Sequence, residues 1–271
     1  MTSVAVRRNR FSALWAKRKV LWLLVRRDLK VRYADSVFGY VWSVLDPLMM
    51  GLIYWFVFTK IFTRGNESTE PYIVFLLAAM LPFMWFQNAV GDSARALRGE
   101  KLVRATALPR EIWVFRLVLA KGAEYVFSLP VLIAFALAYQ AEVNWRIILV
   151  PVAMLLQTLL VSGLALMVAP LVVLVRDVDR VVRIILRFLF YATPILYGVT
   201  DVLDNTAVPD VLKSLYVFNP MTGIVTLYRA GFFPAEMHGS AVAVGAAMSV
   251  AIFVFGWWVF TRLERAVLKE I

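Results

Sequence analysis

The feature that most limits the possible folds is a long uncharged stretch near the middle of the chain. From Ile147 to Val175 no side chain carries a charge, and a helix that crosses a bilayer needs about 20 mostly apolar residues. Five other blocks have similar character, so we predict six membrane-spanning helices. The fifth is the least apolar, because Arg183 and Arg187 lie in its first turns. The expected spans are 39–62, 71–90, 112–139, 147–175, 181–200 and 239–261.

The composition supports the same class of protein. Hydrophobic residues make up 62% and charged residues 17% of the chain, whereas soluble domains contain about 45–50% and about 25%. We therefore expect an all-α membrane protein. Residues 1–38 would form a cytoplasmic tail and an interfacial helix, and 39–271 would form one six-span membrane domain.

The positions of the basic residues predict the orientation. The chain has 29 lysines and arginines and a net charge of +11. An even number of spans puts both termini on the same side of the membrane. If the N-terminus is cytoplasmic, 24 of the 29 basic residues lie on the cytoplasmic side. Cytoplasmic loops carry such an excess, so we expect both termini in the cytoplasm of a bacterial plasma (inner) membrane. The charge is therefore explained by topology, and we expect no nucleic acid as a partner.

The segment before the first span has the pattern of an amphipathic helix. On a helical wheel its apolar side chains share one arc of about 120°. Those side chains are Phe11, Leu14, Trp15, Leu21, Trp22, Val25 and Leu29. We predict a helix in the cytoplasmic membrane interface, with Arg26, Arg27 and Lys30 at the lipid headgroups. The alternative is a basic topology signal without such a helix.

The outer segment 201–238 is too long and too apolar for a simple connector. Short helices are expected over 208–218 and 221–233. Asn219-Pro220 is a helix start, because asparagine caps free amides and proline suits the first helical position. We predict interfacial or re-entrant helices packed on protein, with an ordinary extracellular cap as the alternative.

The sequence also excludes several kinds of site. There is no cysteine and only one histidine, His238, so thiolate and histidine-rich metal sites are excluded. No phosphate-binding loop is present, since the stretch around Lys101 lacks its glycine spacing and hydroxyl residue. Asp46 and Glu124 are acidic residues at membrane depth and could serve an ion-coupled carrier, although Lys121 can pair with Glu124 on one helix face.

Four stretches together resemble one known family. They are 36–48 (SVFGYVWSVLDPL), 108–112 (LPREI), 176–178 with 193–197 (RDV and TPILY), and 219–221 with 228–229 (NPM and YR). In this order and spacing the chain resembles the ABC-2 type permeases that export O-antigen, capsule and teichoic acid polysaccharides. The resemblance covers nearly the whole chain, from the interfacial helix to the sixth span.

The resemblance implies an ATPase partner and explains the missing phosphate loop. Two permeases and two separate nucleotide-binding subunits would form the exporter, with ATP and Mg bound only in the partner. This chain would then be a transport subunit without a cofactor or catalytic residues of its own. The region 99–111 would dock on the ATPase; a solvated topology loop is the alternative. The implied coupling residues are Lys101, Arg104, Pro109, Arg110, Glu111, Arg176 and Asp177.

The resemblance also implies a substrate path along the dimer interface, lined by spans one and five. Sugars present C–H faces that pack on aromatic rings, so aromatic side chains suit such a path, although each could instead face lipid. The candidates are Trp42, Tyr54, Phe58, Phe188, Tyr191 and Tyr197. The segment 201–238 would be an external gate with Asn219, Pro220, Tyr228 and Arg229. Asp46 and Arg187 could line the path or pair across spans.

The expected function is therefore export of a polyprenyl-diphosphate-linked polysaccharide, driven by ATP hydrolysis in the partner. The arginine-rich composition favours a cell-wall galactan as cargo, on composition and resemblance alone. Two alternatives remain open. One is an ABC-2 permease for a drug or small lipid, and the other is an ion-coupled secondary carrier.

Overall fold

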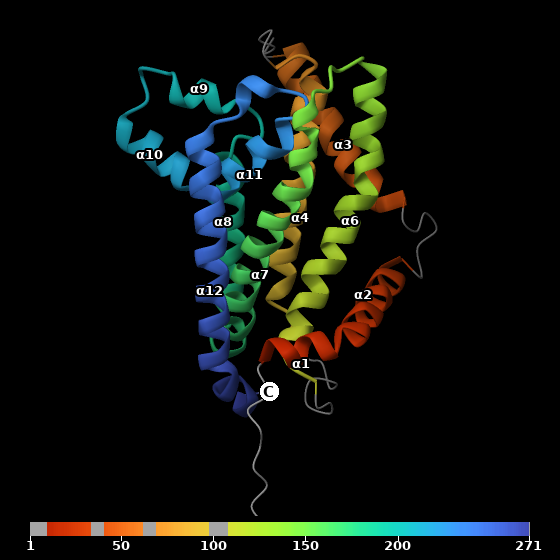
Figure 1. Ribbon diagram of the computed structural model, residues 1–271, viewed down its shortest axis with the longest axis vertical. Helices are drawn as coiled ribbons and strands as arrows, with labels where there is room; N and C mark the ends of the chain where they lie inside the picture. Colours follow the sequence, from red (N-terminus) through yellow and green to blue (C-terminus); the bar gives the residue numbers. More distant parts are fainter. Residues whose placement is uncertain (1–9, 34–40, 62–68, 98–107, 271) are drawn as a thin grey trace, which may run out of the picture.

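The computed structural model describes residues 10–33, 41–61, 69–97 and 108–270. Within these ranges every regular element is helical, as expected for an all-α chain (Figure 1). The long elements are α2 (Arg18–Tyr33), α3 (Trp42–Phe56), α4 (Tyr72–Ser93), α6 (Glu111–Ala138), α7 (Val150–Leu174), α8 (Val178–Ala192) and α12 (Gly239–Glu270). The short elements are α1 (Arg10–Ala16), η2 (Val57–Ile61), η4 (Trp145–Leu149), α9 (Val199–Leu203), α10 (Asp210–Phe218), α11 (Pro220–Arg229) and η5 (Pro234–Glu236).

Five helical segments of the described chain are long and apolar enough to cross a membrane. They are Val44–Ile61, Tyr72–Ser93, Glu111–Ala138, Trp145–Leu174 and Gly239–Glu270. Each coincides with one of the expected spans, and the first combines α3 with the π-helix η2. The chain is thus a multi-pass membrane protein.

The expected span 181–200 has a different form in the structure. Its helix, α8, has 15 residues and ends at Ala192, so it is about 22 Å long, short of the hydrocarbon core of about 30 Å. The ring of a proline disfavours the α-helical conformation of the residue before it, and here that residue is Thr193, before Pro194. An irregular buried segment, 193–198, therefore follows α8 and leads into α9.

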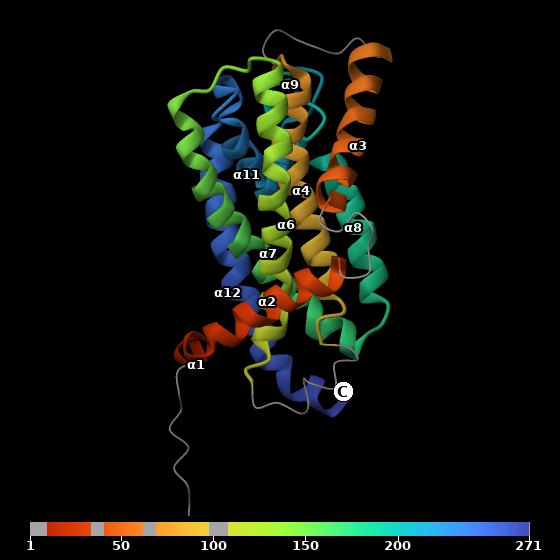
Figure 2. The same ribbon diagram turned by 90° about the vertical axis from the view of Figure 1, so that its right-hand side faces the viewer.

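Helix α4 is the centre of the bundle. Nearly all of its side chains between Tyr72 and Phe86 are buried, and it packs against α3, α6, α7, α8 and α11. Figure 2 shows α4 among its neighbours, with α3 and α8 at the edge of the bundle. Because α3 and α8 both pack on α4, this helix forms the floor between them.

Helices α7 and α12 pack closely along their length. A Cβ atom added to Gly256 would lie 2.1 Å from the carbonyl oxygen of Gly163, so the two backbones touch at these glycines. Small residues allow this approach, which maximises packing between helices in lipid.

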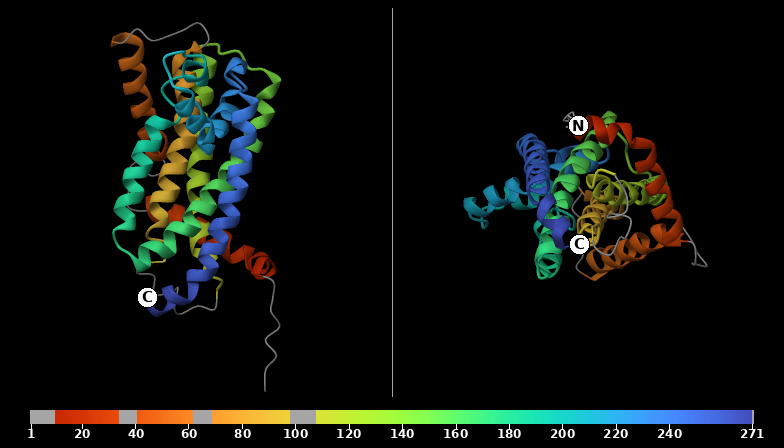
Figure 3. Two further views of the ribbon diagram at one scale, coloured as in Figure 1. Left: turned by 90° about the vertical axis from the view of Figure 1, so that its left-hand side faces the viewer. Right: turned by 90° about the horizontal axis from the view of Figure 1, so that it is seen from below.

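Helices α1 and α2 lie at one end of the bundle, and α9 and α10 lie at the other (Figure 1). Seen from below, α1 and α2 run along the outside of the bundle (Figure 3). α2 packs on α6 through the buried Leu24 and Val25, while Trp15 and Trp22 are exposed. The expected helical segment is present as the two helices α1 and α2, and its amphipathic placement in a membrane interface stays a prediction.

The outer segment contains the two short helices that the sequence predicts. α10 and α11 coincide with the ranges expected over 208–218 and 221–233, although α11 ends earlier, at Arg229. The side-chain oxygen of Asn219 accepts a hydrogen bond from the amide of Met221 at 3.1 Å, and Pro220 is the first helical residue. The predicted helix start is confirmed.

Candidate functional site

A cavity of about 490 Å³ lies between α3, α4 and α8. It brings together residues that are more than 130 positions apart in the sequence, because α4 holds both other helices. Its lining combines aromatic, amide and charged side chains. These residues are Met50, Tyr54, Gln87, Asn88, Gly91, Asp92, Arg95, Arg183, Leu186, Arg187, Phe190 and Tyr191.

One wall of the cavity is aromatic. The ring of Phe190 on α8 lies 5.9 Å from the ring of Tyr54 on α3 and 5.2 Å from the ring of Tyr191. Phe190 in turn packs on the buried Phe83 of α4, at 5.5 Å between ring centroids. The aromatic wall is therefore anchored in the core and links the two helices that flank the cavity.

Another part of the lining, called here the basic wall, carries positive charge. Arg183 and Arg187 are four positions apart and thus lie on one face of α8, and Arg95 follows the end of α4. Arg183 forms an ion pair with Asp179 on its own helix. Within the described chain neither Arg95 nor Arg187 has a carboxylate at salt-bridge distance. The wall therefore has an excess of positive charge.

The cavity contains one carboxylate, Asp92, which is bound from the side of α2 and α6. Its Oδ2 atom lies 3.2 Å from Arg32 and 3.3 Å from Lys121. Lys121 also contacts Glu124 at 3.0 Å, as the spacing of these two residues predicts. Arg32 contacts Glu124 at 3.2 Å. These four charges balance one another, so Asp92 does not neutralise the arginines.

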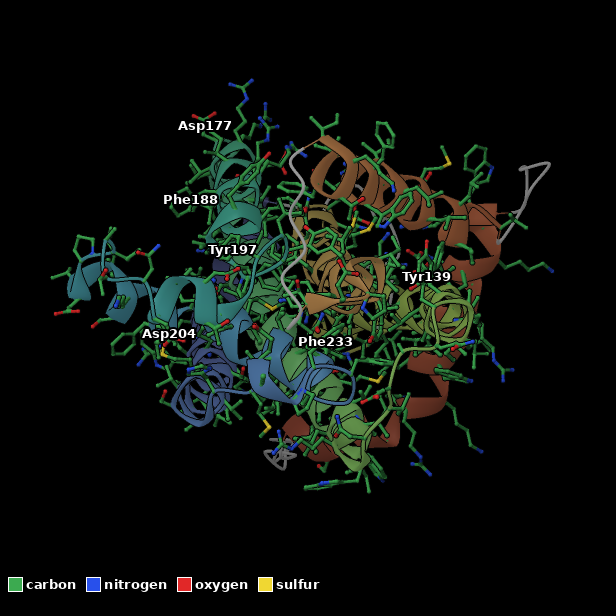
Figure 4. All side chains as sticks on the ribbon, turned by 90° about the horizontal axis from the view of Figure 1, so that it is seen from above. Tyr139, Asp177, Phe188, Tyr197, Asp204 and Phe233 are labelled. Atoms are coloured by element: carbon green, nitrogen blue, oxygen red, sulfur yellow. The ribbon has the colours of Figure 1, made fainter. Side chains whose placement is uncertain are left out.

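The structure places only some of the predicted aromatic residues at this cavity. Tyr54 and Tyr191 line it, and Phe58 lies next to Tyr54, with 6.4 Å between ring centroids. Phe188 is 70% exposed and lies on the side of α8 that faces away from the bundle (Figure 4). Trp42 is exposed at the start of α3. That these aromatic residues line a substrate path stays a prediction.

Tyr197 lies beyond the cavity, in the irregular segment after α8. Its hydroxyl donates a hydrogen bond to the carbonyl of Tyr191 at 2.7 Å, and its ring stacks on Tyr216 of α10 at 6.3 Å. It thus connects the end of α8 to the outer helices.

Sequence reasoning missed several residues of the cavity. Phe190, Arg95 and the amides of Gln87 and Asn88 line it. The adjacent amides at the end of an otherwise apolar span were a usable signal, because polar side chains in spans commonly mark substrate pathways. Arg95 carries no such signal, since an arginine just past a span usually reflects topology.

The end of the molecule that contains α9, α10 and α11 is organised around Arg229. This side chain is completely buried and donates hydrogen bonds to Ile195 at 2.7 Å, Phe75 at 3.0 Å and Tyr197 at 3.3 Å, all at backbone carbonyls. Its guanidinium also lies 3.4 Å from the centroid of the Phe75 ring. Arg229 therefore supplies donors to a buried segment that lacks helical hydrogen bonds.

Two other side chains complete this arrangement. The amide nitrogen of Asn219 donates to the carbonyl of Ala192 at 3.2 Å and to the hydroxyl of Thr193 at 3.0 Å, and the hydroxyl of Tyr72 donates to the carbonyl of Leu196 at 2.9 Å. Irregular backbone at membrane depth requires such internal partners. The TPILY, NPM and YR stretches thus meet in one buried cluster.

A buried carboxylate lies near the arginine. Glu236 accepts hydrogen bonds from the amide of Val199 at 2.7 Å and the hydroxyl of Thr200 at 2.9 Å. Burial lowers the pKa of Arg229 to about 10, and the charge of Glu236 opposes this shift. The guanidinium thus remains charged at neutral pH. The last gate candidate, Tyr228, is also buried, with its ring against Tyr125 at 5.7 Å.

The predicted coupling residues are only partly described. Lys101 and Arg104 lie outside the described residues. Pro109 is partly buried just before α6, Arg110 forms an ion pair with Glu264 of α12 at 3.3 Å, and Glu111 is buried in the first turn of α6. Arg176 and Asp177 are exposed in the loop before α8. In the view from above, Asp177 lies at the edge of the molecule (Figure 4).

The predicted headgroup contacts lie on α2. Arg26 and Lys30 are exposed, and the guanidinium of Arg26 lies 5.6 Å from the Trp22 ring. Arg27 pairs with Asp28 at 3.2 Å. Asp28 also binds the buried Arg116 of α6 at 3.0 Å, which attaches α2 to the bundle.

The acidic residues considered for ion coupling have different surroundings. Asp46 is exposed on α3, and no ion pair joins it to Arg187 within the described chain. Glu124 belongs to the balanced group with Asp92, Lys121 and Arg32. In the described part of the chain no group of three His, Cys, Asp or Glu residues could hold a metal ion.

Known proteins resemble this chain over most of its length. Residues 19–233 match the family model of ABC-2 type transporters. An O-antigen export system permease protein (RfbA) of Myxococcus xanthus is 31% identical over 242 residues, which cover 88% of this chain and 90% of the relative. Its namesake in Klebsiella pneumoniae is 25% identical over 90% of this chain and 92% of the relative. The polysialic acid transport protein KpsM of Escherichia coli is 23% identical over 91% of this chain and 94% of its own length. The chain therefore belongs to the ABC-2 type transporter family.

Proposed function

We propose that this chain is the membrane-spanning permease subunit of an ATP-driven exporter that moves a lipid-linked polysaccharide across the plasma membrane. The relatives with the highest similarity among those described are named for O-antigen export. The observation that carries the proposal is the cavity between α3, α4 and α8. It places aromatic rings, amides and guanidinium groups side by side.

The lining of the cavity suits a glycan. Flat C–H faces of a sugar pack on rings such as Tyr54 and Tyr191 by dispersion, while its hydroxyls need polar partners such as Gln87 and Asn88. A drug or a simple lipid offers few hydroxyl groups for these amides.

The proposed topology has six crossings. α8 together with the buried segment 193–198 forms the fifth crossing, supported by the donors of Arg229 and Asn219. Both termini lie in the cytoplasm, in keeping with the distribution of basic residues. On this orientation α1 and α2 lie at the cytoplasmic interface and α9 to α11 form the external gate.

ATP hydrolysis takes place in a separate nucleotide-binding subunit that also binds Mg. This part of the proposal follows from the family and from a sequence without a phosphate-binding loop. Two permeases and two ATPases form the exporter, with the region 99–111 as the main contact. The ion pair between Arg110 and Glu264 would connect that region to the end of α12.

The test is ATP-dependent transport by the reconstituted permease–ATPase complex in proteoliposomes. A fluorescent lipid-linked glycan and a lipophilic dye are offered in parallel. The double variant Tyr54→Ala/Tyr191→Ala should lower glycan export about tenfold or more, while the control Trp258→Ala on the exposed side of α12 should not. Dye export with no glycan export would support the drug-exporter alternative. Glycan uptake without ATPase activity would contradict the proposal.

A further inference from the structure

We propose that the basic wall of the cavity is the loading site for the phosphate head of the exported lipid, with Arg95, Arg183 and Arg187 as its anion ligands. This inference rests on the proposed function and makes it more specific. The ligand class is an isoprenoid lipid diphosphate that carries a sugar.

The first support is the chemistry of the wall. A guanidinium presents a planar fork of donors that matches two phosphate oxygens at once. Arg183 and Arg187 present two such forks from one face of α8, and Arg95 adds a third from the end of α4. Of these, only Arg183 has an ionic partner in the described chain. Two guanidinium groups are thus available to an incoming anion.

The second support is the position of these charges. Arg187 is nine residues after the first residue of α8, which places it about 13 Å along the helix. An arginine at membrane depth is costly, and such residues commonly mark the path of a charged substrate. A salt bridge to a carboxylate of the same chain would offset this cost. Within the described residues Arg187 has no such carboxylate partner.

The third support is the arrangement around Asp92. This carboxylate lines the cavity and would repel a phosphate if it were free. Its contacts with Arg32 at 3.2 Å and Lys121 at 3.3 Å neutralise it from the other side. Asp92 is therefore held by charges on α2 and α6 and is not an ionic partner of Arg95 or Arg187.

The surface beside the cavity suits the rest of the ligand. Ile184, Ile185 and Phe188 are exposed apolar side chains on α8, and an isoprenoid chain could lie along them in the lipid. The first sugar would then meet the aromatic wall of Tyr54, Phe190 and Tyr191. The three parts of a lipid-linked glycan thus each meet a matching surface at one site.

Ordinary anionic phospholipids also carry a phosphate, so the experiment has to separate the two sources. The full chain is placed in nanodiscs of neutral lipid, and binding of undecaprenyl diphosphate, undecaprenyl monophosphate and phosphatidylglycerol is titrated by native mass spectrometry. The variants are Arg183→Gln/Arg187→Gln and Arg95→Gln. The matched control is Arg180→Gln, because the side chain of Arg180 is 84% exposed on the same helix and does not line the cavity.

We expect the double variant to weaken diphosphate binding about tenfold or more, while phosphatidylglycerol binding changes less than about twofold. The control should bind like the unmodified chain, and thermal unfolding should show that all variants remain folded. Equal weakening for all three lipids would reveal only a general anionic surface and would overturn the inference. Unchanged diphosphate binding would also overturn it.

Failure of this inference can be told apart from failure of the proposed function. A complex that exports glycan but binds diphosphate without these arginines refutes the inference alone. A chain that binds diphosphate through them but exports no glycan with its ATPase refutes the proposed function. In a further variant, Asp92→Asn, diphosphate affinity should change far less than in the arginine variants. A loss as large as theirs would contradict the account in which Arg32 and Lys121 already neutralise Asp92 and the arginines alone bind the phosphates.

Discussion

The guanidinium of Arg229 donates a hydrogen bond of 2.7 Å to the carbonyl of Ile195, which lies 34 positions earlier in the chain. This contact joins α11 to the irregular segment that follows α8. With the contact to Tyr197 it supplies donors to carbonyls that a continuous helix would satisfy itself, while the contact to Phe75 ties Arg229 to α4. This irregular segment is therefore held by a buried charge, together with the side chains of Asn219 and Tyr72.

Replacing that charge should destabilise the protein strongly. In Arg229→Met the apolar volume is largely kept, but two buried carbonyls and one partly buried carbonyl lose a charged donor, and a loss of about 3 kcal/mol or more is expected. The check is thermal unfolding of the purified protein. Arg262→Met is the control, because Arg262 is exposed on α12. Equal midpoints for both variants would contradict the assigned role.

Both the oxygen and the nitrogen of the Asn219 side-chain amide should contribute to stability. Asn219→Ala removes the helix cap and the two donor contacts, and we expect a loss of about 1–2 kcal/mol. Asn219→Asp keeps the oxygen that accepts from Met221 but removes the donors to Ala192 and Thr193. If the aspartate variant were as stable as the natural protein, the donor contacts would have no energetic role.

A methyl group between α7 and α12 should be poorly tolerated. The Cβ atom of Gly256→Ala would lie 2.1 Å from a backbone oxygen of Gly163, and overpacking of this kind costs about 1–3 kcal/mol or more. Gly239→Ala is the matched control, since nothing lies within 4 Å of its added Cβ. Unfolding in detergent should separate the two variants, and a similar loss in both would refute the close packing.

The contact between Asp28 and Arg116 should hold α2 against α6. Asp28→Asn removes the negative charge that contacts the buried Arg116 at 3.0 Å, and the expected loss is about 1–3 kcal/mol. Hydrogen exchange should increase across α2 and remain unchanged in α7. Lys19→Gln, at an exposed position of the same helix, serves as the control. Unaltered exchange in α2 would show that other contacts dock it.

Local physics made part of this structure predictable. Asn219-Pro220 begins a helix because capping and the geometry of proline act within a few residues. The pair of Lys121 and Glu124 follows from helical spacing alone. Five of the expected spans coincide with long apolar helices because length and composition suffice for a crossing.

The remaining features depend on contacts between distant residues. The partners of Arg229 include Phe75, which is 154 positions away, so its role could not be read from neighbouring residues. The fifth block was expected to be one continuous helix, because hydropathy is insensitive to the break at Pro194. Tyr54 and Tyr191 meet only because α4 holds α3 and α8. The predicted coupling residues Lys101 and Arg104 remain predictions.

The most direct test of the central claim is photo-crosslinking during transport. A benzophenone amino acid is placed at Tyr191 in the cavity or at Trp258 on the exposed side of α12, and the complex is illuminated with lipid-linked glycan and ATP. We predict glycan crosslinks at position 191 that increase during ATP turnover, and only background labelling at 258. Equal labelling at both positions, or none at 191 while export proceeds, would contradict the assignment of the substrate path to this cavity.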